Sequence, residues 1–421
     1  MLDHRGGAAT ERPAPEPRWS AWRVVVGFGV VSLAADMVYE GARSVYGPLL
    51  AGLGASAFTV GLVTGAGEAA ALVLRLVFGP LADRTGRYWS LTLAGYALTA
   101  VCVPLLAVTP FVGAAGLGLA VVLILAERSG KAIRSPSKSA LLAHAAGAVG
   151  RGRGFAVHKA LDQVGALSGP LLVAGLVALS GAIWPAMAAL AVPGAIALGL
   201  LAWIRLRVPD PAVYDPDSSA APPESVGLGG VVAATVGSDL PRRFFLFAAA
   251  AGATTAGLVT FGLIGYHLAT DDLVPTAGVP LVYAVAMAAE AVAALVTGFA
   301  YDRWHGRVLI CLPVLVTIVP ALVFTGRLWV VVLGVIAWGA AAGVQDSTVK
   351  ALVADLVPAA RRATAYGVFA AIQGAAAVLG GALVGALYSR SLLAIVGAIA
   401  ATQLIAAVLL ALSLRPERAR T

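Results

Sequence analysis

Residues 79–87 read GPLADRTGR, and residues 298–307 read GFAYDRWHGR. Each copy is a short charged segment between long apolar stretches. A charged turn of one pattern that occurs twice between apolar stretches indicates a membrane protein built from an internal duplication. We therefore expect two similar halves, each with one copy of this turn.

The composition supports an all-α membrane protein. Of the 421 residues, 60% are hydrophobic and only 12% are charged, and the mean hydropathy is +0.90. Such a chain buries its apolar surface in lipid rather than in one large soluble core. Apolar runs of about twenty residues are long enough to cross a hydrocarbon layer of roughly 30 Å as helices. The twelve transmembrane helices that we expect are 22–50, 57–79, 89–110, 113–141, 154–179, 183–205, 244–269, 278–300, 308–325, 329–355, 363–388 and 391–413.

These spans divide into two pseudo-symmetric six-helix bundles, expected at residues 22–205 and 244–414. The segment 206–243 between them contains a run rich in Pro, Ser and Asp, which is typical of a linker. Residues 1–21 are polar and lack the apolar core of a cleaved signal, so we expect a tail there and a second tail at 415–421.

The arginines predict the topology. They cluster in alternate loops and at the chain ends, whereas the opposite loops carry few of them. Because cytoplasmic loops carry the excess of Lys and Arg, we expect both termini in the cytoplasm and a multi-pass protein of the cytoplasmic (inner) membrane. The net charge of +8 follows from this topology, so we expect no nucleic-acid partner.

Other classes of protein find little support. The two cysteines, Cys102 and Cys311, lie in apolar spans, and no Cys/His cluster has metal-ligand spacing. The glycines of 65–75 lack the lysine of a phosphate-binding loop, and no serine has the surroundings of a hydrolase nucleophile. We therefore expect no enzyme activity, no catalytic residues, no metal and no cofactor.

The two halves also align outside the charged turn. Placing Ala140 on Ala351 superposes 139–172 on 350–383 without a gap. The alignment pairs Asp162 with Gln373, and it supports the duplication as an explanation of the repeated turn.

The turn at 79–87 resembles the charged signature turn of the major facilitator superfamily, whose usual form is G-x-L-a-D-r-x-G-r-[kr]. The second copy has Ala300 at the leucine position and one extra residue. The resemblance implies a monomeric secondary transporter that works by alternating access, with both turns helping to latch the halves on the cytoplasmic side. The gating residues expected on this basis are Asp83, Arg84, Arg87, Asp302, Arg303 and Arg307.

The first span carries a polar face. Asp36, Tyr39, Glu40 and Arg43 occur at i, i+3, i+4 and i+7, so they share one side of a helix. An ionisable group at the bilayer centre costs roughly 2.5–3.5 kcal/mol on insertion scales, so its place there requires pairing or a function. This face is expected to line a cavity or to meet another helix.

The fourth span carries a cationic stripe next to Glu127: Arg128, Lys131, Arg134 and Lys138 follow at helical spacing. In the usual fourth-helix motif of the superfamily, R-x-x-Q-G-x-G, Glu127 takes the glutamine position, but Ile124 stands at the arginine position. In the second half the stripe falls on Gly339, Ala342, Gln345 and Val349, next to Asp346 and Lys350. Because the stripe is not repeated, we expect it to belong to a specialised site.

Several interior charges have two interpretations. Arg75, Lys138 and Lys159 are placed to serve the cavity or to extend to the lipid headgroups. Arg43 either takes part in binding or only neutralises Glu40. The remaining interior groups named here are Glu68, His158, Asp162 and Glu290, of which Asp162 either takes part in coupling or forms a helix-end network with its neighbours.

Together these features predict a proton-coupled transporter of a small anionic or zwitterionic solute, acting as symporter or antiporter, with lipid, protons and solute as its partners. Buried carboxyl groups can alternate between protonated and ion-paired states, and cations bind acids through charge-assisted hydrogen bonds. The alternative is a proton-driven multidrug or toxic-compound exporter. The expected proton-coupling residues are Asp36, Glu40, Glu68, Glu127, His158 and Asp162. The expected substrate-binding residues are Tyr39, Arg43, Arg128, Lys131, Arg134, Asp346 and Lys350.

Overall fold

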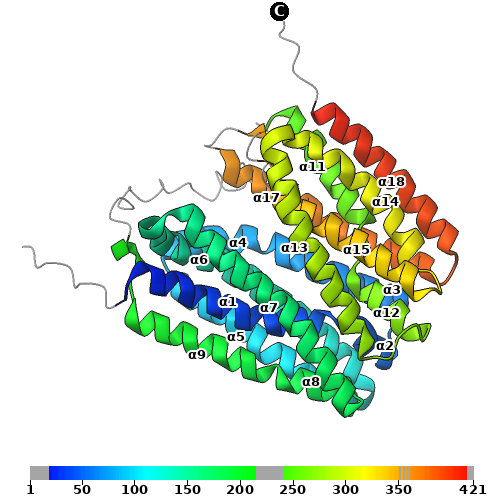
Figure 1. Ribbon diagram of the computed structural model, residues 1–421, viewed down its shortest axis with the longest axis horizontal. Helices are drawn as coiled ribbons and strands as arrows, with labels where there is room; N and C mark the ends of the chain where they lie inside the picture. The colour runs from blue at the N-terminus through cyan, green and yellow to red at the C-terminus, as the bar shows by residue number, and fades with distance from the viewer. Residues whose placement is uncertain (1–18, 215–239, 350–351, 354–355, 358–360, 415–421) are drawn as a thin grey trace, which may run out of the picture.

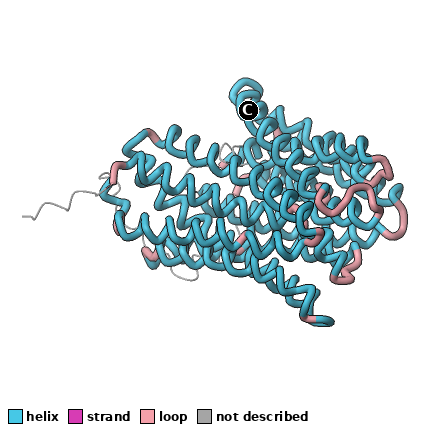
Figure 2. The backbone as a smooth tube through the Cα atoms, turned by 60° about the horizontal axis from the view of Figure 1, so that its bottom comes forward, coloured by secondary structure: helices cyan, strands magenta, loops and turns pink. Residues whose placement is uncertain are grey.

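The computed structural model describes residues 19–214, 240–349, 352–353, 356–357 and 361–414. Within these ranges the chain is almost entirely helical, with short loops between the helices and no strand (Figure 2). Ten stretches are long and apolar enough to span a membrane, and one of them, Gly278–Val323, contains two of the expected spans. A shorter apolar helix, Leu328–Val344, adds to these. The pattern confirms an all-α membrane protein and is consistent with twelve spans.

The helices of the first half pack around α1. Helix α7 lies along α1, α6 lies against α3 and α5, and α9 contacts α1 and α5 (Figure 1). The helices of this half are α1 (Ala21–Arg43), α2 (Tyr46–Gly52), α3 (Ala57–Val73), α4 (Arg75–Thr85), α5 (Tyr88–Leu105), α6 (Gly116–Val149), α7 (Arg151–Ser180), α8 (Ile183–Ala189) and α9 (Ala191–Arg207).

The second half repeats this plan. Helix α11 contacts α17 and α18, and α15 lies between α13 and α14 (Figure 1). Its helices are α11 (Arg242–Gly257), α12 (Phe261–Thr270), α13 (Gly278–Trp304), α14 (Cys311–Val323), α15 (Leu328–Val344), α17 (Arg362–Tyr388) and α18 (Leu392–Ser413).

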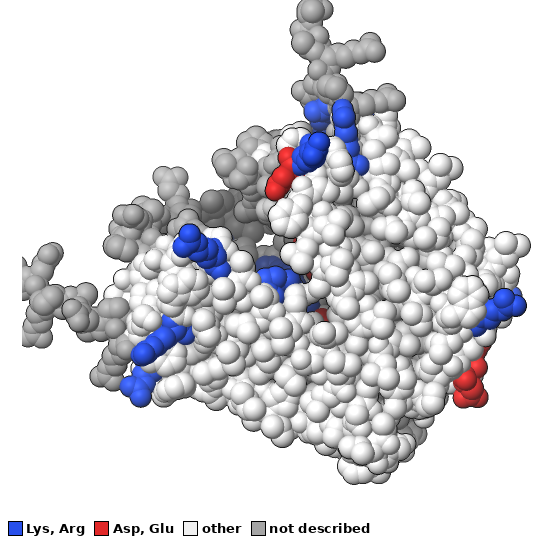
Figure 3. Space-filling view, viewed as in Figure 1, with Lys and Arg blue, Asp and Glu red and all other residues white. Residues whose placement is uncertain are grey.

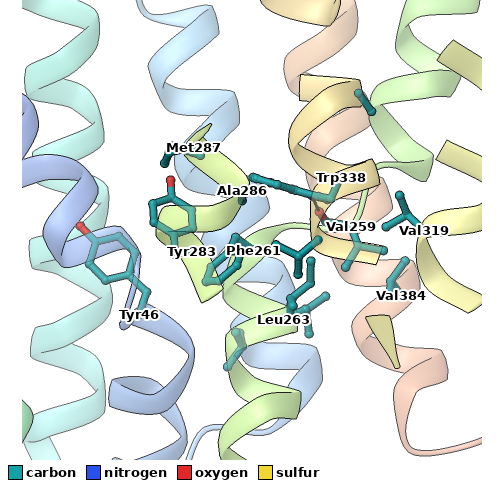
Figure 4. Close-up of a cluster of buried hydrophobic side chains, with 14 of the residues drawn as sticks. Tyr46, Val259, Phe261, Leu263, Tyr283, Ala286, Met287, Val319, Trp338 and Val384 are labelled. Carbon is teal, nitrogen blue, oxygen red and sulfur yellow. Dashed lines mark hydrogen bonds between the residues drawn. The ribbon is translucent and has the colours of Figure 1, made fainter. Parts of the chain in front are cut away.

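The first helix of each half is broken, although the sequence predicted both as continuous. The first break separates α1 from α2 at Ser44 and Val45. Pro48 has no backbone N–H to donate to the carbonyl oxygen of Ser44. The hydroxyl of Ser44 donates to the carbonyl oxygen of Gly41, one turn earlier, at 2.6 Å. The second break, at 258–260, separates α11 from α12. There Trp338 Nε1 donates to the freed carbonyl oxygen of Val259 at 2.5 Å, and Figure 4 shows this indole beside the break.

The expected span 329–355 also differs from the structure. The α-helix ends at Val344 and continues as a π-helical turn over Gln345–Val349 (η6). A π turn widens the helix and is frequent at functional sites. Lys350, which we expected to follow on the same face, lies outside the described residues.

Glycines allow the closest helix contacts. A Cβ atom on Gly165 or Gly169 of α7 would overlap the backbone of α1 at Leu33 and Met37. Between the halves, a Cβ atom on Gly61 of α3 would overlap the carbonyl oxygen of Gly381 of α17. Small residues at such crossings let two backbones touch, so the α3–α17 contact is a backbone seam.

The two charged turns end their helices differently. Gly86 caps α4 with φ of +62°, a left-handed conformation that glycine adopts easily. In the second copy the extra residue, His305, caps α13 with φ of +49°. The insertion therefore places a non-glycine residue at the turning point, and Gly306 follows it.

Candidate functional site

A cavity of about 420 Å³ lies between the two halves. Its walls come from α1, α3, α4, α6 and α7 on one side and from α11, α13, α15 and α17 on the other. Its floor includes Thr260 and Trp338, next to the break between α11 and α12. The space-filling view shows a hollow between the halves with basic and acidic side chains at depth, on the side away from α2 and α12 (Figure 3).

The structure brings most of the predicted site residues to this cavity. Arg128 and Glu127 lie behind its wall, and His158 lies beside it, since none of the three lines the cavity. The predicted residues that line it are Asp36, Tyr39, Glu40, Arg43, Glu68, Lys131, Arg134, Asp162 and Asp346.

The hydroxyl of Tyr39 is the centre of the site. It accepts hydrogen bonds from Arg128 Nη1 at 2.5 Å, from Lys131 Nζ at 2.7 Å and from Arg43 Nη1 at 3.3 Å. The cation of Arg128 also lies 4.5 Å from the centre of the Tyr39 ring, and that of Lys131 lies 3.9 Å from it. Three cationic groups therefore converge on one buried phenol, attracted by both its oxygen and its π face.

Two carboxylates balance part of this charge. Glu68 Oε1 lies 2.6 Å from Arg43 Nη2 and 3.6 Å from Arg128 Nη2. Glu40 Oε2 lies 3.7 Å from Arg43 Nη1 and accepts a hydrogen bond from Tyr283 at 2.5 Å. Arg43 is thus bound more closely to Glu68 than to Glu40, and Glu40 is linked to the second half of the protein.

Glu127 is fully buried behind this cluster. Its Oε2 lies 3.6 Å from Arg128 Nε, yet neither carboxyl oxygen has a hydrogen-bond partner. A buried carboxyl group without hydrogen bonds is costly, and such groups call for a functional explanation.

The rest of the cationic stripe is not neutralised. Arg134 Nη1 bonds to Thr99 Oγ1 at 2.5 Å, and Lys138 Nζ bonds to Ser32 Oγ at 3.0 Å. Arg75 and Lys138 both line the cavity. Within the described residues, Arg75, Lys131, Arg134 and Lys138 form no salt bridge.

A second polar cluster lies between α1 and α7. Asp36 and Asp162 both line the cavity here, and Asp162 Oδ2 lies 2.8 Å from Lys159 Nζ. Next to this pair, His158 Nε2 lies 3.0 Å from Ser32 Oγ. Two carboxyl groups on one cavity wall repel each other when both are charged, so this pair is suited to hold a proton.

The second half contributes acidic and neutral groups. Glu290 lies on the cavity wall, as do Gln345 and Gln373, whose amides donate to Thr255 Oγ1 at 3.5 Å and 3.2 Å. The sequence interpretation missed Tyr283, which shares a helical face with Glu290 two turns later. The sequence signal that could have identified Tyr283 is a tyrosine on the same helical face as an acidic residue within an apolar span.

The predicted gating residues lie outside the cavity. Asp83 is exposed and accepts a hydrogen bond from Tyr88 at 3.1 Å, at the start of α5. Asp302, Arg303 and Arg307 are exposed at the end of α13 and in the segment after it. This arrangement separates the turns from the cavity, and their gating role stays a prediction.

The fold and the charged central cavity define a membrane transporter of two bundles. A family model of the Major Facilitator Superfamily matches residues 28–281 and 244–421. The chain belongs to this superfamily and is a secondary transporter. It is 51% identical over 398 residues to uncharacterized protein Rv2265 of Mycobacterium tuberculosis (strain ATCC 25618 / H37Rv) and to uncharacterized protein Mb2288 of Mycobacterium bovis. Each match covers 94% of both chains.

Solved transporter structures share the fold. A mutant of the nucleoside transporter NupG superposes with a TM-score of 0.76 at 15% identity, covering 93% of this chain and all of that one. A POT family transporter in complex with 5-aminolevulinic acid gives 0.68 at 13% identity, over 93% and 95% of the two chains. A bacterial homolog of the lysosomal transporter Spinster gives 0.65 at 15% identity, over 95% and 96%. At these identities the likeness concerns the fold alone.

Proposed function

We propose that the protein couples proton movement to the transport of a small anionic or zwitterionic solute across the cytoplasmic membrane. The observation that carries this proposal is a group of cations on the cavity wall: four basic side chains line it without a salt bridge in the described part of the chain. Unpaired charges at membrane depth mark substrate or ion pathways. The volume of about 420 Å³ suits a small organic solute.

The solute-binding region is the wall formed by α1 and α6. Lys131 and Arg134 face the cavity, and Lys131 is held only by the Tyr39 hydroxyl and ring. A carboxylate or phosphate group that entered would offer Lys131 a stronger, charge-assisted partner than a phenol. Tyr39 therefore keeps the cations together until a solute arrives.

The proton-coupling region is the carboxyl pair of Asp36 and Asp162. A proton shared by the pair removes the repulsion between the two carboxyl groups. When the proton is lost, Asp162 pairs with Lys159, and Asp36 is attracted to the cations of α6. Since Asp36 lies one turn from Tyr39 on α1, a change in its charge acts directly on the cations that bind the solute.

Alternating access then follows from rocking of the halves around this site. The cavity lies on the side away from α2 and α12, and the end of the protein where these two helices meet is the closed, outer end in this proposal. Both termini lie in the cytoplasm, the charged turns act as the gate of the opposite conformation, and the monomer is the working unit.

The test is solute binding and flux by the purified full-length protein. A thermal-shift panel of organic acids, phosphates, amino acids and cationic dyes is run on the wild type, on Lys131→Ala and on the exposed control Arg207→Ala. We expect stabilisation by acids, its loss in Lys131→Ala and its retention in Arg207→Ala. In liposomes, uptake of the best ligand is then expected to depend on an imposed pH gradient.

Two outcomes would contradict the proposal. Stabilisation by cationic dyes with none by acids would favour the multidrug exporter instead. Solute flux that does not depend on the pH gradient would contradict the proposed proton coupling, but it would not contradict the proposed anion site.

A further inference from the structure

Glu290 is an acid of the cavity that the proposed cycle does not use. It lies near the middle of α13, which spans Gly278–Trp304, and its side chain lines the cavity. Within the described ranges it has no hydrogen bond and no salt bridge. An acid at the centre of a membrane helix is costly and marks a functional position unless a partner neutralises it.

Three acids of the first half differ from Glu290 in this respect. Glu68 is bound by Arg43 at 2.6 Å, Glu40 by Tyr283 at 2.5 Å and Asp162 by Lys159 at 2.8 Å. Each of these groups has a donor within the protein. Among the described residues, Glu290 therefore differs from these three carboxylates in having no donor.

The internal duplication indicates what is missing. The alignment that superposes Asp83 on Asp302 places Glu68 at Met287, one helical turn from Glu290. Arg128, which binds Glu68, corresponds to Gly339 in the second half. A Cβ atom on Gly339 would overlap the carbonyl oxygen of Ala286, so α15 has no room there for a cationic side chain. The second half keeps an acid on this face but lacks the second of the two cations, Arg43 and Arg128, that neutralise Glu68.

The surroundings of Glu290 suit a cationic ligand. Thr255, Gln345 and Gln373 line the same wall, and both amide Nε2 atoms are directed at Thr255 Oγ1. The two amide carbonyl oxygens are left as acceptors. Trp338 lines the cavity as well and adds an aromatic ring, which favours a nearby cation.

We propose that Glu290 binds a positively charged group of the transported solute. The solute then carries an acid group, held at Lys131 and Arg134, and an ammonium or guanidinium group, held at Glu290 across the cavity. This inference rests on the proposed anion site and narrows its solute class to zwitterions. A zwitterion bound in this way touches both halves, and so its binding is coupled to their relative position.

The test uses matched compounds that differ only in the amino group. A series of ω-amino acids of increasing length and α-amino acids is compared with the corresponding des-amino acids, by thermal shift and by competition binding with the full-length protein. The variants are Glu290→Gln, which keeps the shape, and Glu290→Asp, which keeps the charge. We expect Glu290→Gln to weaken binding of the best zwitterion about 10-fold to 100-fold and to leave its des-amino analogue unchanged. Glu290→Asp is expected to retain part of the preference.

The outcomes separate this inference from the proposed function. If Glu290→Gln weakens binding of the zwitterion and of its des-amino analogue equally, or weakens neither, Glu290 does not bind the amine. The proposed anion site is still supported in that case, provided that Lys131→Ala abolishes binding of both compounds. If Glu290→Gln stops proton-driven uptake but leaves zwitterion affinity unchanged, Glu290 carries a proton and the inference is wrong. A panel in which only des-amino acids bind, or in which no compound binds, also overturns it.

Discussion

Two buried tyrosines allow a direct measurement of the bond that joins the halves. Tyr283 of α13 donates its hydroxyl to Glu40 of α1 at 2.5 Å, and the ring is fully buried. Tyr46 of α2 is equally buried, but its hydroxyl has no hydrogen-bond partner. Figure 4 shows both rings in the same apolar cluster. Substituting each by Phe therefore removes the same atom with opposite consequences.

The expected magnitudes follow from these contacts. Tyr283→Phe removes a hydrogen bond to a carboxylate and leaves Glu40 only Arg43 at 3.7 Å, so the free energy of unfolding should fall by roughly 1.5–3 kcal/mol. Tyr46→Phe removes a buried hydroxyl that satisfies nothing, so the same free energy should stay constant or rise by up to about 1–3 kcal/mol. The two variants should lie on opposite sides of the wild type.

The assay is reversible unfolding of the full-length protein in mixed detergent micelles, with loss of helical circular dichroism as the signal. The double variant tests independence, since the two hydroxyls have different surroundings and their effects should add. Equal losses in both single variants would mean that packing of the phenol, not its bond to Glu40, determines stability. An unchanged free energy of unfolding in Tyr283→Phe would show that the hydrogen bond to Glu40 does not stabilise the contact between the halves.

Three further predictions concern other parts of the fold. Gly61→Leu should block the backbone seam with α17 and lower transport by at least about tenfold without loss of folding, whereas Gly118→Leu, at an open position, should be neutral in the same flux assay. Asp162→Asn should abolish the pH dependence of uptake while solute exchange between equilibrated compartments continues, and a retained pH response would refute its role in coupling. Gly86→Val should lower the thermal midpoint, because its φ of +62° costs a β-branched residue roughly 1–2 kcal/mol; an unchanged midpoint would contradict this.

The sequence predicted the parts of the site that depend on helical spacing. The face of Asp36, Tyr39, Glu40 and Arg43 lines the cavity as expected, because a long helix fixes which residues share a side. The all-helical duplicated architecture was predictable for the same reason, since it depends on the length of apolar runs and on a repeated turn.

The parts that could not be predicted depend on contacts between distant helices. The α11–α12 break has no proline or glycine within 258–260, and the indole that stabilises it comes from α15. The bond between Glu40 and Tyr283 joins residues 243 positions apart, and periodicity says nothing about such a pair. Spacing also gives no position for Glu127, predicted as a proton-coupling residue, which the structure buries behind the cavity wall.

The backbone seam between α3 and α17 has a consequence for the speed of the transport cycle. Where Gly61 faces Gly381, no side chains interlock, so the two helices can part without any rotamer change. Where Gly61 meets Gly381, the surface exposed on opening includes the peptide carbonyl groups of both glycines, which water can hydrate at once. The seam can therefore seal the protein tightly and still open with a low kinetic barrier, and larger residues there would slow turnover even where they fit.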